Sequence, residues 1–277
     1  MKIGVKIGPA LDRSVGEAAR KAEALGFDSV WVSERVAVPL DKPHPYEPMV
    51  DPWVTLGFVA AVTERVQLGT SVSQIALRPP VLMARELATL DRLSNGRVIV
   101  GAGAGWVEEE FTSTGVEFAT RGGRLNEFLP LLRHLWTNPE EAWNGKHFTI
   151  PAVGLVRPLT EGGPPIYLGA GGPPALRRAA KYGDGFIAVS VPPASLVKLR
   201  ERLLAMRAEF GRKGPFPMYT QTPPPRSAEE AKELVRAHAE AEVDGIILAA
   251  SGSVSAIDFL DQADVVQAVL VAAREER

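Results

Sequence analysis

The stretch PIYLGAGGPPALRRAAKYGDGFIAVS, residues 165–190, decides the fold of this chain. It begins with a short apolar run that ends in glycine, passes through two prolines into a helical segment, and ends in a second apolar run. Continuous apolar runs of this length are typical of strands buried on both faces of a parallel sheet. The stretch therefore predicts one strand–helix–strand unit.

The same unit recurs along the 277 residues. Apolar runs lie at residues 3–7, 29–33, 66–72, 97–101, 165–169, 184–190, 216–222 and 244–249. The segments between them carry apolar side chains at helical spacing, as at positions 196, 199, 203, 206 and 210. Eight such units predict a single α/β domain over residues 1–277, a (β/α)₈ TIM barrel. An open doubly wound sheet is the alternative, and the lack of a dinucleotide-binding fingerprint disfavours it.

Two segments interrupt the repeating pattern. Residues 36–49 hold four prolines and follow the second strand, whereas residues 138–164 precede the fifth. Loops that follow the strands of a barrel build its active site. We therefore expect the first insertion to be a candidate lid, and the second, with a possible extra strand at residues 146–150, to be a decoration.

Composition excludes several classes of function. The chain has 31 Lys and Arg against 33 Asp and Glu, and this balance argues against nucleic acid as a partner. It has no cysteine, which excludes disulfides, thiolate metal sites and cysteine nucleophiles, and its four histidines lack metal-ligand spacing. No targeting segment and no apolar stretch of membrane-spanning length is visible, so we expect a cytoplasmic protein without membrane contact.

Two glycine-rich turns are candidate ligand sites. The run GAGAGW at residues 101–106 misses the dinucleotide pattern because Trp106 replaces the last glycine, so it is either a flexible turn or a backbone that a planar ligand approaches closely. The run GAGGPP at residues 169–174 opens a helix that carries Arg177 and Arg178. Free N–H groups at a helix start favour an anion such as phosphate, although a tight turn explains the glycines equally simply.

Polar and aromatic side chains at strand ends are further candidates. Glu34 and Arg35 follow the second strand, where they form either a rim ion pair or part of a site. His44 lies between two prolines in the first insertion. Trp106 follows the fourth strand and could wall a flat ligand or simply pack.

Several phrases together resemble the bacterial luciferase-like monooxygenase superfamily, and within it the branch that uses the deazaflavin coenzyme F420. The phrases are AEALGFDSVW at residues 22–31, TERVQLGT at 63–70, TLDRLSNGR at 89–97, GAGAGW at 101–106 and DGF at 184–186. The order and spacing of these phrases are specific to the superfamily, and the resemblance extends over residues 1–190. The resemblance implies a TIM barrel that holds a flavin or deazaflavin at the carboxyl ends of its strands.

The resemblance also implies particular cofactor-binding residues. A non-prolyl cis peptide at the end of the third strand backs the ring in this family, and the matching bond here joins Ser71 and Val72. The cofactor's phosphate region matches the second glycine turn. The expected cofactor-binding residues are Ser71, Val72, Ser73, Gly103, Ala104, Gly105, Gly169, Ala170, Gly171 and Gly172.

For the chemistry, the resemblance implies hydride transfer between F420 and a small-molecule substrate. Glu34 is the candidate catalytic acid or base, and Arg35, His44 and Trp106 are candidates for substrate binding. Many deazaflavin members have histidine where Arg35 stands, and the sugar-phosphate dehydrogenases have an acid where Trp106 stands, which argues against a sugar-phosphate substrate.

Several alternatives stay open at this point. An FMN-dependent monooxygenase would use the same ring and phosphate sites, and a flavin-binding protein without turnover would lack a catalytic group. A phosphate-binding isomerase on an unrelated barrel rests on fold analogy alone. The family also implies a homodimer formed through barrel helices.

Overall fold

The computed structural model describes residues 1–8, 14–40, 49–169, 171–249 and 255–276. Within these residues, eight parallel strands close into a barrel in the order β1–β10–β9–β8–β7–β4–β3–β2, which confirms the predicted TIM barrel. The barrel strands are β1 (Lys2–Lys6), β2 (Ser29–Val32), β3 (Gln67–Thr70), β4 (Val98–Ala102), β7 (Ile166–Gly169), β8 (Gly185–Val189), β9 (Met218–Thr222) and β10 (Gly245–Leu248).

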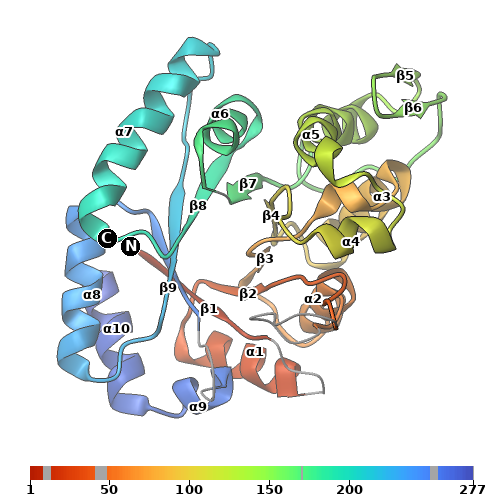
Figure 1. Ribbon diagram of the computed structural model, residues 1–277. Helices are drawn as coiled ribbons and strands as arrows, with labels where there is room; N and C mark the ends of the chain where they lie inside the picture. The colour runs from red at the N-terminus through yellow and green to blue at the C-terminus, as the bar shows by residue number, and fades with distance from the viewer. Residues whose placement is uncertain (9–13, 41–48, 170, 250–254, 277) are drawn as a thin grey trace.

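Helices follow the strands and cover the outside of the barrel (Figure 1). They are α1 (Ser14–Leu25), α2 (Pro52–Ala60), α3 (Pro80–Leu93), α4 (Glu108–Ser113), α5 (Arg121–Thr137), α6 (Pro173–Tyr182), α7 (Pro193–Glu209), α8 (Ala228–Glu240), α9 (Ala256–Leu260) and α10 (Ala263–Glu275). Two short 3₁₀ helices, η1 (Ile75–Leu77) and η2 (Phe118–Thr120), complete the set. No helix within the described ranges is long and apolar enough to cross a membrane.

The second interruption of the pattern forms a small hairpin. Strands β5 (Trp143–Asn144) and β6 (Thr149–Ile150) pair antiparallel between α5 and β7, outside the barrel. The Glu127 carboxylate on α5 accepts hydrogen bonds from the backbone N–H groups of His147 and Phe148, which fastens the hairpin to the helix. The first interruption lies largely outside the described residues.

The barrel interior is filled by one ring of large side chains. Trp31, Ile99, Tyr167, Ile187, Tyr219 and Ile247 form this inner cluster, which is separate from the larger core between strands and helices. Trp31 is fully buried, and a Cβ atom on Gly69 of the neighbouring strand would lie 2.2 Å from its ring. Glycine on β3 therefore makes the room that the indole needs. The cluster therefore fills the barrel interior below the carboxyl ends of the strands.

Candidate active site

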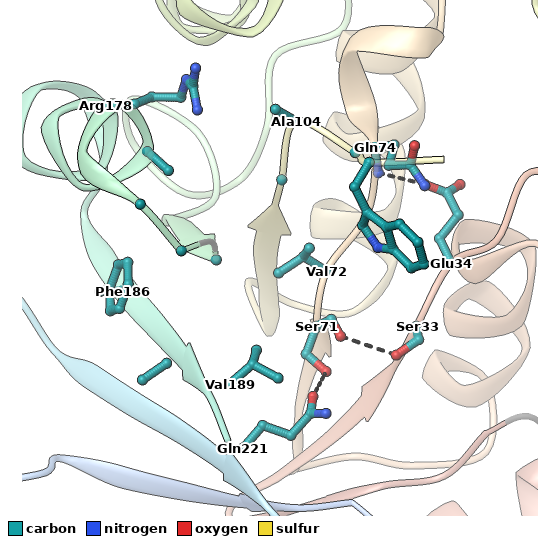
Figure 2. Close-up of a pocket in the computed structure, with 18 of the residues that line it drawn as sticks. Ser33, Glu34, Ser71, Val72, Gln74, Ala104, Arg178, Phe186, Val189 and Gln221 are labelled. Carbon is teal, nitrogen blue, oxygen red and sulfur yellow. Dashed lines mark hydrogen bonds between the residues drawn. The ribbon is translucent and has the colours of Figure 1, made fainter. Parts of the chain in front are cut away.

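A cavity of about 820 Å³ opens at the carboxyl ends of the strands, above the inner cluster. Its volume is in the range of cavities that hold cofactors. The cavity brings together most of the predicted site residues (Figure 2): Glu34, Arg35, Ser71, Val72, Gly103, Ala104, Gly105, Trp106, Gly169, Gly171 and Gly172. Ser73 is fully buried beside this group, and His44 and Ala170 lie outside the described residues.

The end of β3 has the backbone geometry that the family implies. The peptide bond between Ser71 and Val72 is cis, which confirms that prediction. The Ser71 carbonyl accepts a hydrogen bond from Ser33 Oγ at 3.0 Å, and Ser71 Oγ donates to Gln221 Oε1 at 2.9 Å. These bonds tie the ends of β2, β3 and β9 together at the floor of the cavity (Figure 2).

The Val72 side chain packs over two of the predicted glycines. A Cβ atom would lie 2.7 Å from Val72 Cγ2 if built on Gly103, and 2.5 Å from Val72 Cγ1 if built on Gly169. Both strands must therefore lack a side chain here for Val72 to take its place at the cavity wall. The result is an apolar, convex wall against which a flat ring can pack.

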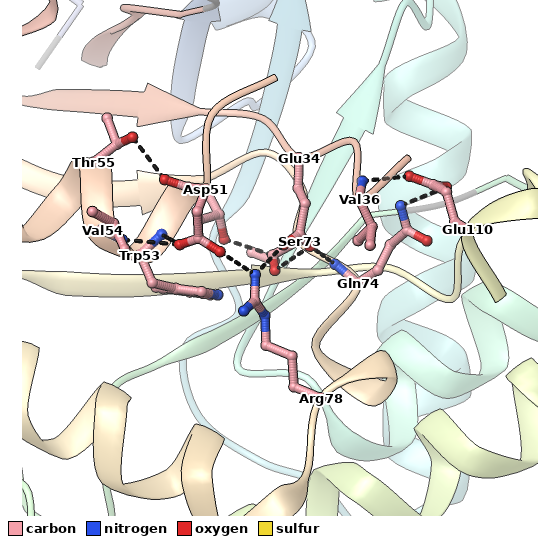
Figure 3. A network of polar contacts seen from close by, with 12 residues as sticks. Glu34, Val36, Asp51, Trp53, Val54, Thr55, Ser73, Gln74, Arg78 and Glu110 are labelled. Carbon is pink, nitrogen blue, oxygen red and sulfur yellow. Dashed lines mark hydrogen bonds and ion pairs between the residues drawn. The ribbon is translucent and has the colours of Figure 1, made fainter. Parts of the chain in front are cut away.

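Glu34 is held in a buried polar network (Figure 3). Its carboxylate accepts hydrogen bonds from Ser73 Oγ at 2.7 Å, from the backbone N–H of Gln74 at 2.6 Å and from Arg78 Nη2 at 2.5 Å. Arg78 also pairs with Asp51, whose other oxygen caps the start of α2. Burial lowers the pKa of Arg78, but the Glu34 and Asp51 carboxylates together outweigh it and leave that pKa raised. The network fixes the β2 and β3 ends relative to α2.

Arg35 has a different acidic partner. Its Nη1 lies 3.0 Å from Oε2 of Glu110, and the same carboxylate accepts hydrogen bonds from the Val36 backbone N–H and the Gln74 side chain. The Arg35 guanidinium lies over the Trp106 ring, 5.2 Å from its centroid. Trp106 is 55% exposed. Arg35 and Trp106 therefore form a stacked pair at the cavity mouth.

The second glycine turn also lines the cavity, beginning at Gly169 beside Val72. A Cβ atom on Gly171 or Gly172 would meet no atom within 4 Å, so this cradle is open. Pro173 and Pro174 begin α6 and have no N–H groups, and the N–H groups of residues 175 and 176 already bond to the Gly172 carbonyl. Among the described residues of this turn, the donors that remain are the backbone N–H groups of Gly171 and Gly172.

Two arginines that line the same cavity add positive charge to it. Arg178 lines the cavity and is held by Asn126 Oδ1 and the Gly122 carbonyl, and Arg121 lines it from the start of α5. Burial lowers the pKa of Arg178, and nearby Arg121 lowers it further. Glycine N–H groups and two guanidinium groups fit a phosphate-bearing ligand.

Several residues of this site were not predicted from sequence: Lys6, Gln74, Arg78, Glu110, Arg121 and Gln221. Glu110 is one of three consecutive glutamates, and nothing in the sequence separates it from the others, although it alone of the three is fully buried. Lys6 had one signal, its place at the end of an apolar run.

Comparison with known proteins agrees with this architecture. The sequence model of the family described as luciferase-like monooxygenase matches residues 8–276. An uncharacterised protein of Mycobacterium tuberculosis is 35% identical over 184 residues, which cover 61% of this chain and 65% of the relative. An F420-dependent glucose-6-phosphate dehydrogenase of Amycolatopsis mediterranei is 38% identical over 202 residues, covering 69% and 58%. The aligned part of this chain thus spans less than two thirds of either relative.

A solved structure extends the likeness over nearly the whole barrel. An F420-dependent secondary alcohol dehydrogenase, in complex with an F420–acetone adduct, superposes with a TM-score of 0.83 at 22% identity. The match covers 97% of this chain and 98% of the other. At this identity the match establishes the shared fold.

Proposed function

This chain belongs to the luciferase-like monooxygenase family, and we propose that it is an oxidoreductase that moves a hydride between coenzyme F420 and a small organic substrate. One observation carries the proposal: a single cavity is lined both by the Val72 wall and by the open Gly171–Gly172 cradle. A ring packed on Val72, with its phosphate-bearing tail in the cradle, would occupy both parts of this cavity. The related dehydrogenase of Amycolatopsis mediterranei supports F420 as that cofactor.

In this proposal the phosphate end anchors the cofactor. The N–H groups of Gly171 and Gly172 would donate to phosphate oxygens, and Arg121 and Arg178 would supply the positive charge. Arg178 is held rigidly by Asn126 and Gly122, so it loses little conformational freedom on binding. We assign Ala170 to the same group as a prediction from its place in the turn.

Near the ring, Val72 would back one ring face, with Ser71, Gly103, Ala104 and Gly105 around it, and Ser73 stays a prediction. The bound deazaflavin supplies a hydride donor or acceptor, and the protein supplies position, a dry pocket and a proton. The Val72 wall leaves the substrate to approach from the side where Arg35 and Trp106 lie. These two residues are our candidates for substrate contact, and His44 stays a prediction.

Glu34 stays a candidate acid or base. Its carboxylate accepts three hydrogen bonds in this structure, and these favour a positioning role in which Glu34 holds Ser73 and Gln74. The two roles differ in their effect on pH profiles. If Glu34 is catalytic, the Glu34→Gln variant should lose one limb of the pH–rate profile. If Glu34 is a positioning residue, the same variant should keep the profile and be less stable.

The substrate side differs from what a sugar phosphate needs. Trp106 and Arg35 present an aromatic ring and one cation, already paired with Glu110, at the cavity mouth. This surface suits a substrate with an apolar or flat body better than a sugar phosphate.

Turnover with each cofactor tests the proposal. The protein is incubated with oxidised F420 and a panel of alcohols, and with reduced F420 and the matching carbonyl compounds, while deazaflavin absorbance is followed. A parallel reaction supplies reduced FMN and oxygen and follows oxygen uptake coupled to product formation. We expect substrate-dependent change with F420 alone. Substrate oxygenation with reduced FMN, and no turnover with F420, would assign the protein to the FMN-dependent monooxygenases instead.

A further inference from the structure

Lys6 is the last residue of β1, and its side chain lies inside the barrel. Lys6 pairs in register with Trp31 on β2, whose ring belongs to the inner cluster. Two residues earlier, a Cβ atom on Gly4 would lie 2.5 Å from Trp31 Nε1, so this side of β1 faces the interior. Because side chains alternate along a strand, Lys6 shares that side and rises one layer above the cluster. It accordingly lines the cavity floor.

The Lys6 ammonium group has no acidic partner in the described part of the chain. The two buried glutamates nearest in the site are already engaged, Glu34 by Arg78 and Glu110 by Arg35. No hydrogen bond or ion pair joins the Lys6 side chain to any described residue. Lys6 is half-buried, and an ammonium ion withdrawn from water without a counter-ion is costly, so its retention points to a ligand that uses it.

The groups around Lys6 favour loss of its proton. Arg35 faces it from the end of β2 beside Glu34, which is paired with Arg78, and β10 on the other side carries no charged residue. Ser71 and Gln221, which line the same cavity floor from β3 and β9, are neutral. Burial and then the Arg35 charge lower the pKa of Lys6 from 10.5 to about 8. An amine that exchanges its proton near neutral pH is suited to acid–base catalysis.

We propose, on the basis of the function proposed above, that Lys6 is a catalytic residue that exchanges a proton with the substrate oxygen. The substrate is then a carbonyl compound in one direction and the corresponding alcohol in the other. Lys6 would supply the proton transfer that Arg35, with its permanent charge, cannot perform.

The reaction balances with these partners alone. In reduction, the carbonyl carbon gains a hydride from the reduced deazaflavin, and the carbonyl π electrons move to oxygen. The oxygen gains the proton of the Lys6 ammonium group as its N–H bond breaks. Lys6 is left as a neutral amine, which water reprotonates. Oxidation of the alcohol runs the same steps in reverse, with neutral Lys6 as the base.

The first measurement titrates Lys6 without turnover. Acetylation of the protein with acetic anhydride is followed by mass spectrometry of the Lys6 peptide across pH, with and without bound F420. We expect a titration midpoint near pH 8 and protection of Lys6 by F420. A Lys6 that is unreactive across the whole range, or equally reactive with F420 bound, would place it away from the cofactor cavity and overturn the proposal.

The second measurement compares Lys6→Met with Lys2→Met, which removes an exposed lysine from the other end of the same strand. Reduced F420 is supplied with acetone, cyclohexanone or benzaldehyde. Loss of a general acid predicts a fall in kcat of about 100-fold or more for Lys6→Met. The fall of kcat above about pH 8 should disappear with it. Added ethylamine should restore part of the rate, which a structural role would not allow.

A measurement of F420 binding distinguishes failure of the Lys6 assignment from failure of the proposed function. Lys6→Met should bind F420 within about threefold of the wild type by calorimetry. If the wild type binds no F420, the proposed function fails. If it binds F420 but reduces none of the carbonyl compounds, or if Lys6→Met keeps its rate, the assignment of Lys6 fails while the proposed function stands.

Discussion

Replacing Lys6 with methionine should make the folded protein more stable, by an amount that depends on pH. The pKa of Lys6 falls from 10.5 to about 8 on folding, chiefly because burial disfavours its charged form. Each tenfold change in an acid constant is worth about 1.4 kcal/mol, so the charge on Lys6 costs the folded state about 3.5 kcal/mol. Below pH 8 this cost is present in full, because both states are protonated.

The sign of the pH dependence follows from the direction of that shift. Between about pH 8 and 10.5 the folded chain has lost the Lys6 proton while the unfolded chain still binds it, so the Lys6 contribution to stability rises with pH. The advantage of Lys6→Met should therefore be about 3.5 kcal/mol at pH 7 and shrink as the pH approaches 10.5. Any packing gain from the methionine adds a constant that does not vary with pH.

Urea denaturation followed by tryptophan fluorescence measures this difference. Wild type, Lys6→Met and the control Lys2→Met are unfolded at pH 7 and at pH 10.5, and the free energy of unfolding is compared at each pH. Taking differences between variants cancels the titration of all other groups. A Lys6→Met effect of the same size at both pH values, or a destabilisation at pH 7, would refute the reasoning. A costly charge retained at a cavity floor is the trade-off expected of a functional residue.

Four further substitutions test other parts of the structure. Glu34→Gln leaves Arg78 facing a neutral group and should lower the free energy of unfolding by about 1–3 kcal/mol in urea; an unchanged midpoint would contradict the buried network. Gly101→Ala would place Cβ 1.6 Å from the Thr70 carbonyl oxygen and should prevent recovery of folded protein, whereas Gly57→Ala on α2, with no atom within 4 Å of the added Cβ, should gain about 0.5–1 kcal/mol; equal thermal stability of the two would contradict the glycine argument. Trp106→Ala removes a ring that is 55% exposed and should raise the substrate KM by about tenfold with little change in melting temperature; an unchanged KM would remove Trp106 from the substrate site.

The sequence was sufficient for the barrel because its signals are local. Each buried strand, such as residues 184–190, is a continuous apolar run, and eight of them leave few other arrangements. The run at residues 101–106 was interpreted as a backbone that a planar ligand approaches closely, and the run at 169–174 as a phosphate site. In the structure, the group that closely approaches Gly103 and Gly169 is the Val72 side chain, which follows β3.

The polar network was not predictable because its partners are distant in sequence. Glu34 and Arg35 are neighbours and were interpreted as a possible ion pair, yet Glu34 binds Arg78, 44 positions away, and Arg35 binds Glu110, 75 positions away. Alternation shows that Lys6 and Gly4 share a side of β1, but not that this side faces the interior. Closure of the barrel decides which side of β1 faces the interior, and therefore which lysine reaches the cavity.

Calorimetric titration of the purified protein with F420 and with FMN tests the central claim most directly. The cavity joins the Val72 wall to the Gly171–Gly172 cradle, and the account predicts that F420 binds there about tenfold or more tightly than FMN. Adding large side chains in the cradle, as in Gly171→Trp, should abolish the binding while the melting temperature stays close to that of the wild type, because no atom lies within 4 Å of a Cβ at this position. Tighter binding of FMN than of F420, or no binding of either, would contradict the account.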